Sequence, residues 1–187
     1  MRLTKPRIQP LSDDQLNEDQ RDALKDFQPG PILNIFRTLV NAPKALTRFN
    51  AWGGYVLSRR NDLPSREREI VILRIGYLCK SGYEWTQHHR IGLREGLTAE
   101  EIERIKAGAG AGWTPAEAAL IKAADELHAD QFVTDATWAE LKAHFSDKQC
   151  LDVVFTAAQY TQVSMMLNTF GVQLDAGQTL DPDLKGF

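Results

Sequence analysis

Glu84 and His88 are the residues whose types and spacing point most directly to acid–base chemistry. They lie four positions apart in a segment with helical spacing, so their side chains share one helix face and can meet. A carboxylate beside an imidazole raises the pKa of the imidazole and fixes its orientation, and both effects suit a general acid or base. Such pairs are also common on ordinary helix surfaces, so their surroundings must decide between a catalytic and a structural interpretation.

Aromatic and apolar residues surround this pair in the sequence. Tyr83 and Trp85 flank Glu84 and could grip a small planar ligand while excluding water. Upstream, Glu69 stands at the edge of a nearly wholly apolar segment, where a carboxylate either caps the core or faces a cavity. Perturbed acid–base groups in apolar clefts are candidate sites. We therefore interpret the segment 83–88 as the candidate reacting centre, with His88 as the proton-handling residue.

Helix start and stop signals outline the elements that must position these residues. Capping boxes begin at Ser12, Thr98, Thr114 and Ser146, and glycines that favour helix ends follow several periodic segments. The short apolar run 70–73 could form a buried strand, but no turn residue follows it until Ser81, which favours one buried helix. The predicted helices are 13–27, 31–41, 43–59, 65–80, 83–95, 98–107, 115–129, 135–144 and 147–170.

These elements predict an all-α single domain over residues 1–187. The last helix, 147–170, is apolar on most sides, so we expect it to be buried within the domain or against another subunit. This apolar excess predicts a homo-oligomer, whether dimer, trimer or hexamer. The N-terminal arm (1–12) and the C-terminal arm (175–187) lack periodicity, and we expect them to fray or wrap a neighbour rather than to pack.

Composition restricts the classes of function. The chain has 187 residues and a net charge of −3, which argues against nucleic acid as a partner. No segment approaches the ~20 apolar residues that span a bilayer, and residues 1–15 lack a signal-peptide-like apolar stretch, so we expect no membrane association and a cytoplasmic protein. Two distant cysteines make no Cys-x-x-Cys pair, and Glu84, His88 and His89 cannot converge from one helix, so we expect no metal site.

Three parts of the sequence together resemble a known family: the stretch 63–74 with its Arg-Glu-Arg-Glu, the segment Tyr-Glu-Trp-Thr-Gln-His at 83–88, and Gly-Leu-Thr at 96–98. In combination they resemble the carboxymuconolactone decarboxylase family of the alkylhydroperoxidase-like superfamily. The resemblance is strongest over 45–108 and continues more weakly to Asn168. It implies an alkylhydroperoxidase-like helical bundle and a lyase of aromatic compound catabolism that removes carbon dioxide from a small carboxylated, lactone-like substrate without a cofactor.

The peroxidase branch of the same superfamily has a glutamate, a Cys-x-x-Cys beginning twelve positions later, and a histidine four positions after the second cysteine. Here Ser81 and Glu84 occupy the cysteine positions between Glu69 and His88, and Cys79 has no resolving partner nearby. A peroxiredoxin-like dithiol cycle is therefore not expected. A thiol-redox activity inherited from the superfamily remains an alternative, as does a non-catalytic helical oligomer that binds a ligand.

The decarboxylase resemblance implies roles for particular side chains. His88 would donate a proton to the carbon that receives the electrons, oriented by Glu84 or Glu69. The nearest arginines for a substrate carboxylate are Arg68 and Arg74, although a structural salt bridge would account for either. An ideal hairpin places His88 beside position 75, about two turns from Glu69, so the role of Glu69 rests on the resemblance alone.

Two further polar residues belong to the candidate site. Tyr160 and Asn168 lie in the apolar last helix, where buried polar groups need partners, and we expect them to line the pocket. Together with Tyr83, Trp85 and Arg68, they complete the predicted substrate-binding set.

Overall fold

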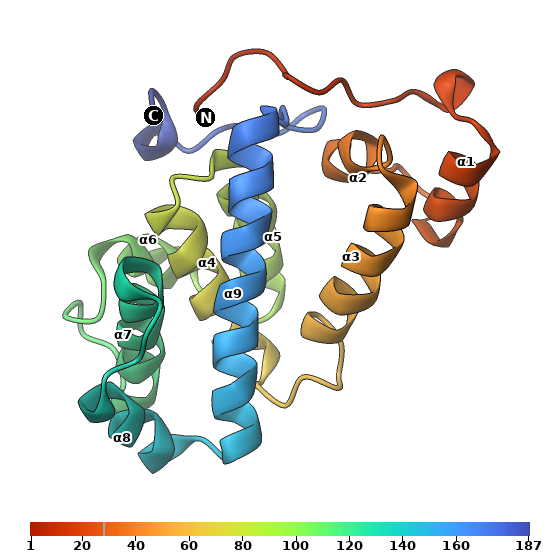
Figure 1. The fold of residues 1–187 in the computed structure, drawn as a ribbon. Coiled ribbons are helices and arrows are strands. Elements are labelled where there is room, and N and C mark those ends of the chain that lie inside the picture. Colours follow the sequence, from red (N-terminus) through yellow and green to blue (C-terminus); the bar gives the residue numbers. More distant parts are fainter. Residues whose placement is uncertain (28) are drawn as a thin grey trace.

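The computed structural model describes residues 1–27 and 29–187, and these ranges contain helices but no strand, which confirms the all-α prediction. Figure 1 shows the arrangement. The α-helices are α1 (Glu18–Leu24), α2 (Asn34–Leu39), α3 (Pro43–Val56), α4 (Ser65–Leu78), α5 (Gly82–Arg94), α6 (Ala99–Ala107), α7 (Pro115–Asp130), α8 (Asp135–His144) and α9 (Asp147–Phe170). Short 3-10 turns cover Asp13–Gln15, Lys25–Phe27 and Pro182–Leu184.

The predicted helix 13–27 is divided in the structure. Ser12 begins only a 3-10 turn, and Asn17 then caps α1 by accepting a hydrogen bond from the backbone amide of Gln20. Because a capping residue adopts extended backbone angles, a cap inside a helical pattern interrupts the helix. The prediction of one helix over 13–27 is therefore wrong, whereas the helix predicted across 70–73 is present within α4.

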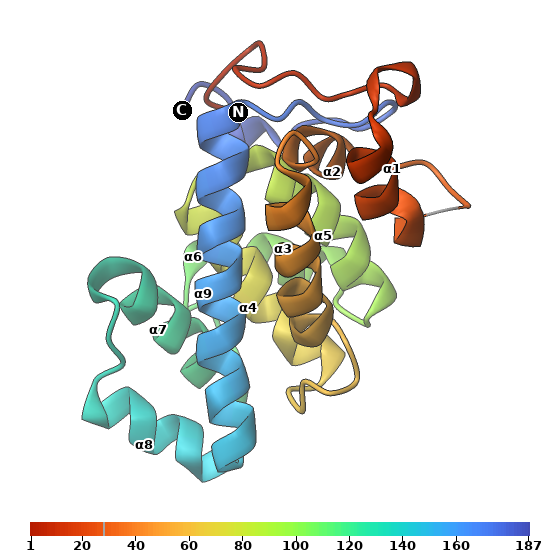
Figure 2. The same cartoon turned by 45° about the vertical axis from the view of Figure 1, so that its right-hand side comes forward.

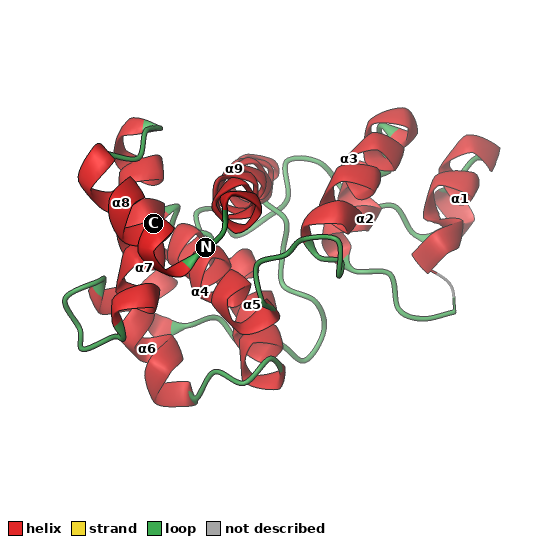
Figure 3. Ribbon diagram, turned by 90° about the horizontal axis from the view of Figure 1, so that it is seen from below, coloured by secondary structure: helices red, strands yellow, loops and turns green. Residues whose placement is uncertain are grey.

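Helix α4 forms the centre of the fold. Every residue from 68 to 76 is buried, and α4 packs chiefly against α5, α7 and α9. Figure 3 shows α4 surrounded by these three helices. A helix covered on all sides has no amphipathic stripe, which explains the long apolar run in its sequence. Charged residues on α4 must therefore find partners inside the protein.

The first three helices form a layer beside this bundle. In Figures 1 and 2 they lie next to α5 and α9, away from α7 and α8. Their own apolar cluster includes Leu24, Val40 and Leu46. A second cluster joins the layer to the bundle by packing Ile35 with Tyr83 and with residues near the end of α9. Side chains of the N-terminal layer consequently face α5 and α9.

The terminal arms pack on the bundle, contrary to the prediction that they fray or wrap a neighbour. The backbone amide of Arg7 donates to the carbonyl of Phe170 at 2.8 Å. Leu180 and Leu184 join the apolar cluster around Trp85, whose indole N–H donates to Asp181 at 3.0 Å. Polar groups of α5 are hydrogen-bond partners of the C-terminal arm. The sequence of the arm alone, which lacks periodicity, could not predict this packing. Figure 2 shows both chain ends near the same end of α9.

Two surface properties complete the fold. Over the described ranges, none of the helices has both the length and the apolar character required to cross a bilayer. Apolar side chains on α9 nonetheless reach the surface, since Leu151 and Met165 are exposed. The homo-oligomer stays a prediction.

Candidate active site

A histidine between two glutamates forms the centre of the candidate site. His88 Nδ1 lies 2.7 Å from Glu69 Oε2, at hydrogen-bonding distance, and His88 Nε2 lies 3.1 Å from Glu84 Oε1. The second contact lies within ion-pair range but lacks hydrogen-bond geometry, and Glu84 Oε1 has no hydrogen-bond partner among the described residues. All three side chains are buried. The structure thus brings together the three predicted catalytic residues.

Close packing of α4 and α5 brings these groups together. The chain reverses after α4 through Lys80, whose φ is 53°, and α5 begins at Gly82. At Gly76 the helices approach so closely that a Cβ atom would lie 3.3 Å from Glu84 Cγ. The 2.7 Å contact shows that Glu69 reaches His88, a question that the ideal hairpin left open.

Burial and mutual charge set the protonation of the cluster. Burial raises the pKa of Glu84 to about 7, with the charge on Glu69 adding to the rise and His88 opposing it. Burial alone would lower the pKa of His88, but the two carboxylates outweigh it and raise this pKa above its ordinary value. Near neutral pH the cluster therefore holds a carboxyl that is partly protonated beside an imidazole whose charged form the carboxylates favour. Such a group can give up or take a proton at physiological pH.

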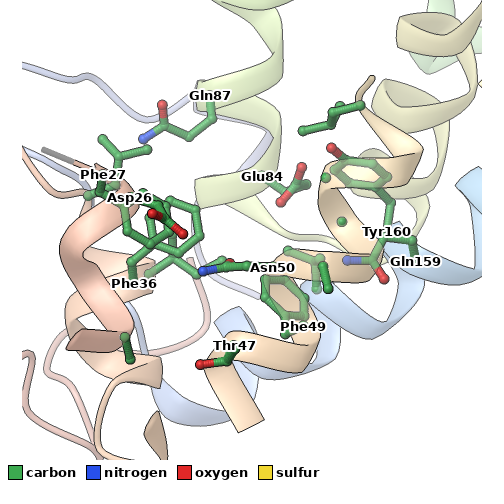
Figure 4. Close-up of a pocket in the computed structure, with 18 of the residues that line it drawn as sticks. Asp26, Phe27, Phe36, Thr47, Phe49, Asn50, Glu84, Gln87, Gln159 and Tyr160 are labelled. Carbon is green, nitrogen blue, oxygen red and sulfur yellow. The ribbon is translucent and has the colours of Figure 1, made fainter. Parts of the chain in front are cut away.

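A cavity of about 710 Å³ opens at this cluster, between the N-terminal layer and helices α5 and α9. His88 and Glu84 line it, whereas Glu69 lies behind His88 and does not. Figure 4 shows Glu84 and Tyr160 at one end of the cavity, with Asp26 and Phe27 toward the other. The apolar part of its wall includes Phe27, Leu33, Ile35, Phe36, Phe49 and Val163. This combination of apolar walls and a few convergent polar groups is typical of a small-molecule site.

Tyr160 forms the wall beside the histidine. Its ring meets the His88 ring edge-on, with centroids 4.8 Å apart. Burial and the nearby carboxylates raise the pKa of Tyr160 well above its ordinary value, so the phenol stays neutral and can donate a hydrogen bond. Tyr160 thus lines the cavity at His88, and its role in substrate binding stays a prediction.

The other predicted binding residues are dispersed. Tyr83 lines the cavity, and its hydroxyl donates to Asp175 at 2.6 Å. Trp85 points away, is almost fully buried in the core and does not line the cavity. Asn168 donates to the carbonyl of Cys79 on the far side of α9, and Arg68 lines a different cavity. Trp85 packs into the core and Asn168 binds the end of α4, so neither side chain lines the cavity.

Sequence reasoning missed several polar groups of the cavity wall, among them Gln159 and Asn50. Gln159 is buried, and its Oε1 has no hydrogen-bond partner in the described part of the chain. Asn50 projects from α3 into the same space (Figure 4). The polar character of Gln159 within an apolar helix was a usable signal, since it adjoins Tyr160. Asn50 carried none, because it lies in a helix with many polar residues.

The two cysteines lie outside this site. Both are free, and burial raises the pKa of each thiol. Cys79 Sγ lies 3.6 Å from His128 Nδ1, whereas Cys150 belongs to the core around α4. Neither lines the cavity at His88.

The family model described as the carboxymuconolactone decarboxylase family matches residues 43–126. This segment belongs to that family. It contains α4, α5 and the Glu69–His88–Glu84 cluster but not Tyr160 or the first two helices of the N-terminal layer. The family match supports a general enzyme-like role for the chain. No curated protein sequence is significantly similar to it.

Solved structures establish the fold. An uncharacterised peroxidase-related protein from Ralstonia eutropha JMP134, described as an alkylhydroperoxidase AhpD core, superposes with a TM-score of 0.79 at 21% identity, over 91% of this chain and 93% of its own. A protein of unknown function from Agrobacterium tumefaciens, described as a putative antioxidant defence protein AhpD, gives 0.68 at 20% identity, over 74% and 95%. A single-substitution variant of the debrominase Bmp8, in complex with 2,3,4-tribromopyrrole, gives 0.72 at 13% identity, over 92% and 94%. The chain therefore has the alkylhydroperoxidase-like helical fold.

Proposed function

We propose that this protein is a cofactor-independent acid–base enzyme, a decarboxylase or a close relative of one, that acts on a small carboxylated substrate such as a lactone acid. The observation that carries the proposal is the buried Glu69–His88–Glu84 cluster at the wall of a largely apolar cavity. The family of residues 43–126 supports the reaction class.

The proposed reaction needs an electron sink in the substrate and a proton donor in the protein. The bond between the substrate carbon and its carboxylate breaks, carbon dioxide leaves, and the electron pair moves into a conjugated carbonyl to give an enolate. Carbon at the far end of this enolate then takes a proton from His88 Nε2, and the imidazole regains a proton from water. Glu69 is a positioning residue, because it holds Nδ1 and does not line the cavity.

The charge of the cavity wall suits this reaction. Among the described lining residues, Lys25 is the one lysine or arginine, and its ammonium contacts Asp22 at 2.8 Å. A bidentate arginine would stabilise the starting carboxylate more than the transition state, because the charge leaves that position as carbon dioxide departs, and this would slow the reaction. Neutral donors such as Gln159 and Tyr160 can hold the substrate without slowing the reaction in this way. We therefore propose them as the binding groups in place of Arg68.

The placement of the cysteines gives the thiol-redox alternative little support. Neither thiol lines the cavity, and burial raises the pKa of both, which disfavours the reactive thiolate. The debrominase neighbour binds a small halogenated ring, which is compatible with a planar ligand in this fold. A non-catalytic oligomer that binds a ligand would keep the cavity but would not require the buried Glu69–His88–Glu84 cluster.

Carbon dioxide release from carboxymuconolactone tests the proposal, with related unsaturated lactone acids as further substrates. We expect His88→Ala to lower turnover by about 10²–10⁴-fold, the range for loss of a general acid. His89→Ala is the matched control, because His89 lies on another face of α5 and does not line the cavity. Equal turnover by wild type and His88→Ala would refute the role of His88. Saturable binding of these acids without product over long incubation would favour the ligand-binding alternative.

A further inference from the structure

A second cavity, of about 810 Å³, lies at the start of α4 and is separate from the candidate active site. Its wall is mainly polar and includes Ser58, Arg59, Ser65 and Arg68. The cavity at His88 shares only Leu57 with it among the described lining residues. The proposed function assigns no role to this second cavity.

Arg68 is the unusual group in this cavity. It is only 7% exposed, yet no carboxylate of the described chain lies within ion-pair distance of its guanidinium. Its Nη atoms make long contacts of 3.4 Å to the Ser58 carbonyl and 3.3 Å to Ser65 Oγ, and its Nε has no partner in the described ranges. A buried cation without a counter-charge is costly, because burial removes its hydration and nothing replaces it. The guanidinium therefore needs an anion.

The first turn of α4 adds a second source of positive potential. Pro64 occupies the N-cap and supplies no side-chain hydrogen bond, whereas Thr114 caps α7 and Ser146 caps α9. The opening backbone amides of a helix have no intrahelical acceptors, and the helix dipole favours negative charge near them. Leu63, Pro64 and Ser65 place this uncapped end in the wall of the same cavity.

The acidic residues of the same wall do not satisfy Arg68. Asp62 and Glu95 line the cavity, and both are exposed. Asp62 lies 4.0 Å from the ammonium of Lys148, and its backbone amide donates to Asp152. Glu95 ends α5 at the cavity rim. Arg59, also exposed on this wall, adds a further cation.

We propose that this cavity binds a small oxyanion, a phosphate or a carboxylate group, through the guanidinium of Arg68 and the first backbone amides of α4. The planar guanidinium can pair with two oxygens of such a group, and Arg59 can contact it from the rim. This site goes beyond the proposed function, because its ligand binds outside the cavity that contains His88.

We expect an anion at this site to affect His88 through charge. Three other charged or titratable groups face His88, namely Glu69, Glu84 and Tyr160, and the positive charge of Arg68 lowers the pKa of His88 against the two carboxylates. An anion bound at Arg68 offsets that charge and raises the pKa of His88. Because such coupling is reciprocal, protonation of His88 favours the anion.

Calorimetric titration of the full chain with inorganic phosphate, and separately with acetate, tests the site and distinguishes the two sources of oxyanion. We expect saturable binding of at least one of them, weakened by about tenfold or more in Arg68→Met and less in Arg68→Lys. Arg68→Met removes a buried unpaired charge, so we expect it to remain folded, and Arg68→Lys provides a second test that keeps the charge. Lys25→Met, in the other cavity, is the control that leaves binding unchanged.

Two further readouts separate this site from a structural role for Arg68. In the wild type, the anion that binds shifts the titration of the His88 imidazole to higher pH. In Arg68→Met, His88 already titrates at higher pH without the anion, and adding the anion causes no further shift. Binding of neither anion, or equal binding by wild type and Arg68→Met, overturns the proposal. It is also overturned if Arg68→Met and Glu95→Gln both destabilise the protein and to a similar extent, because Glu95 would then be the partner of Arg68.

Discussion

Replacement of Glu84 by glutamine should change how stability depends on pH. Burial raises the pKa of this carboxyl from 4.5 to about 7, so the folded protein keeps a proton that the unfolded chain releases across that window. The contribution of Glu84 to the free energy of unfolding therefore falls as pH rises from 4.5 to 7. At ~1.4 kcal/mol per pH unit, the contribution of Glu84 amounts to about 3 kcal/mol.

Glutamine has the shape of the protonated carboxyl but cannot ionise. We expect Glu84→Gln to flatten the stability profile between pH 4.5 and 7 and to be more stable than the wild type at pH 8. The raised pKa of His88 acts with the same sign, but its contribution begins to be lost only above about pH 6.5. The range from pH 4.5 to 6 therefore isolates Glu84.

Urea unfolding followed by circular dichroism at intervals of half a pH unit measures this difference. Glu18→Gln, at an exposed glutamate of α1, is the matched control and should follow the wild-type profile. Parallel profiles for wild type and Glu84→Gln between pH 4.5 and 6 would refute the reasoning, because burial would then have no effect on this carboxyl.

Four further outcomes are expected. Turnover should fall as pH rises above about 7, since the ionised Glu84 then holds the proton on His88 more strongly, and a pH–rate profile measures this. The double variant Cys79→Ala/Cys150→Ala should keep turnover within about a factor of two, because neither thiol lines the cavity. Gly171→Ala should lower the melting temperature, because its φ is 71° and a Cβ would meet a backbone oxygen at 2.8 Å. Gly54→Leu should weaken binding of cavity ligands, because Gly54 lines the cavity, and calorimetry measures this. It should not lower the melting temperature, because a Cβ at this position meets open space and leucine has a higher helix propensity than glycine.

Periodicity and capping signals predicted most of the helices. The capping boxes at Thr98, Thr114 and Ser146 begin α6, α7 and α9 as expected. The region 13–27 was predicted incorrectly, because Asn17 was taken as part of a helical pattern rather than as a cap. Local signals thus specify where helices begin, except where two caps compete.

Only the part of the candidate site that lies on a single helix was predictable from the sequence. Glu84 and His88 share a face of one helix, so their spacing was sufficient to associate them. Glu69 could not be placed, because its distance from His88 depends on how closely α4 and α5 pack at Gly76. Trp85 could not be assigned to the core, because its partner Asp181 lies 96 residues later in the sequence. Long-range packing, which no local pattern encodes, decided these residues.

The hydrogen bonds between α5 and the C-terminal segment have a consequence for biosynthesis. Asp175 accepts hydrogen bonds from Tyr83 and Gln87, and Asp181 accepts one from Trp85, so residues on both sides of Glu84 depend on a segment made much later. During translation α5 emerges from the ribosome long before these acceptors exist. The acid–base cluster therefore takes its final geometry only after residues 175–181 have left the exit tunnel, and a nascent chain paused before that point holds an incomplete active site.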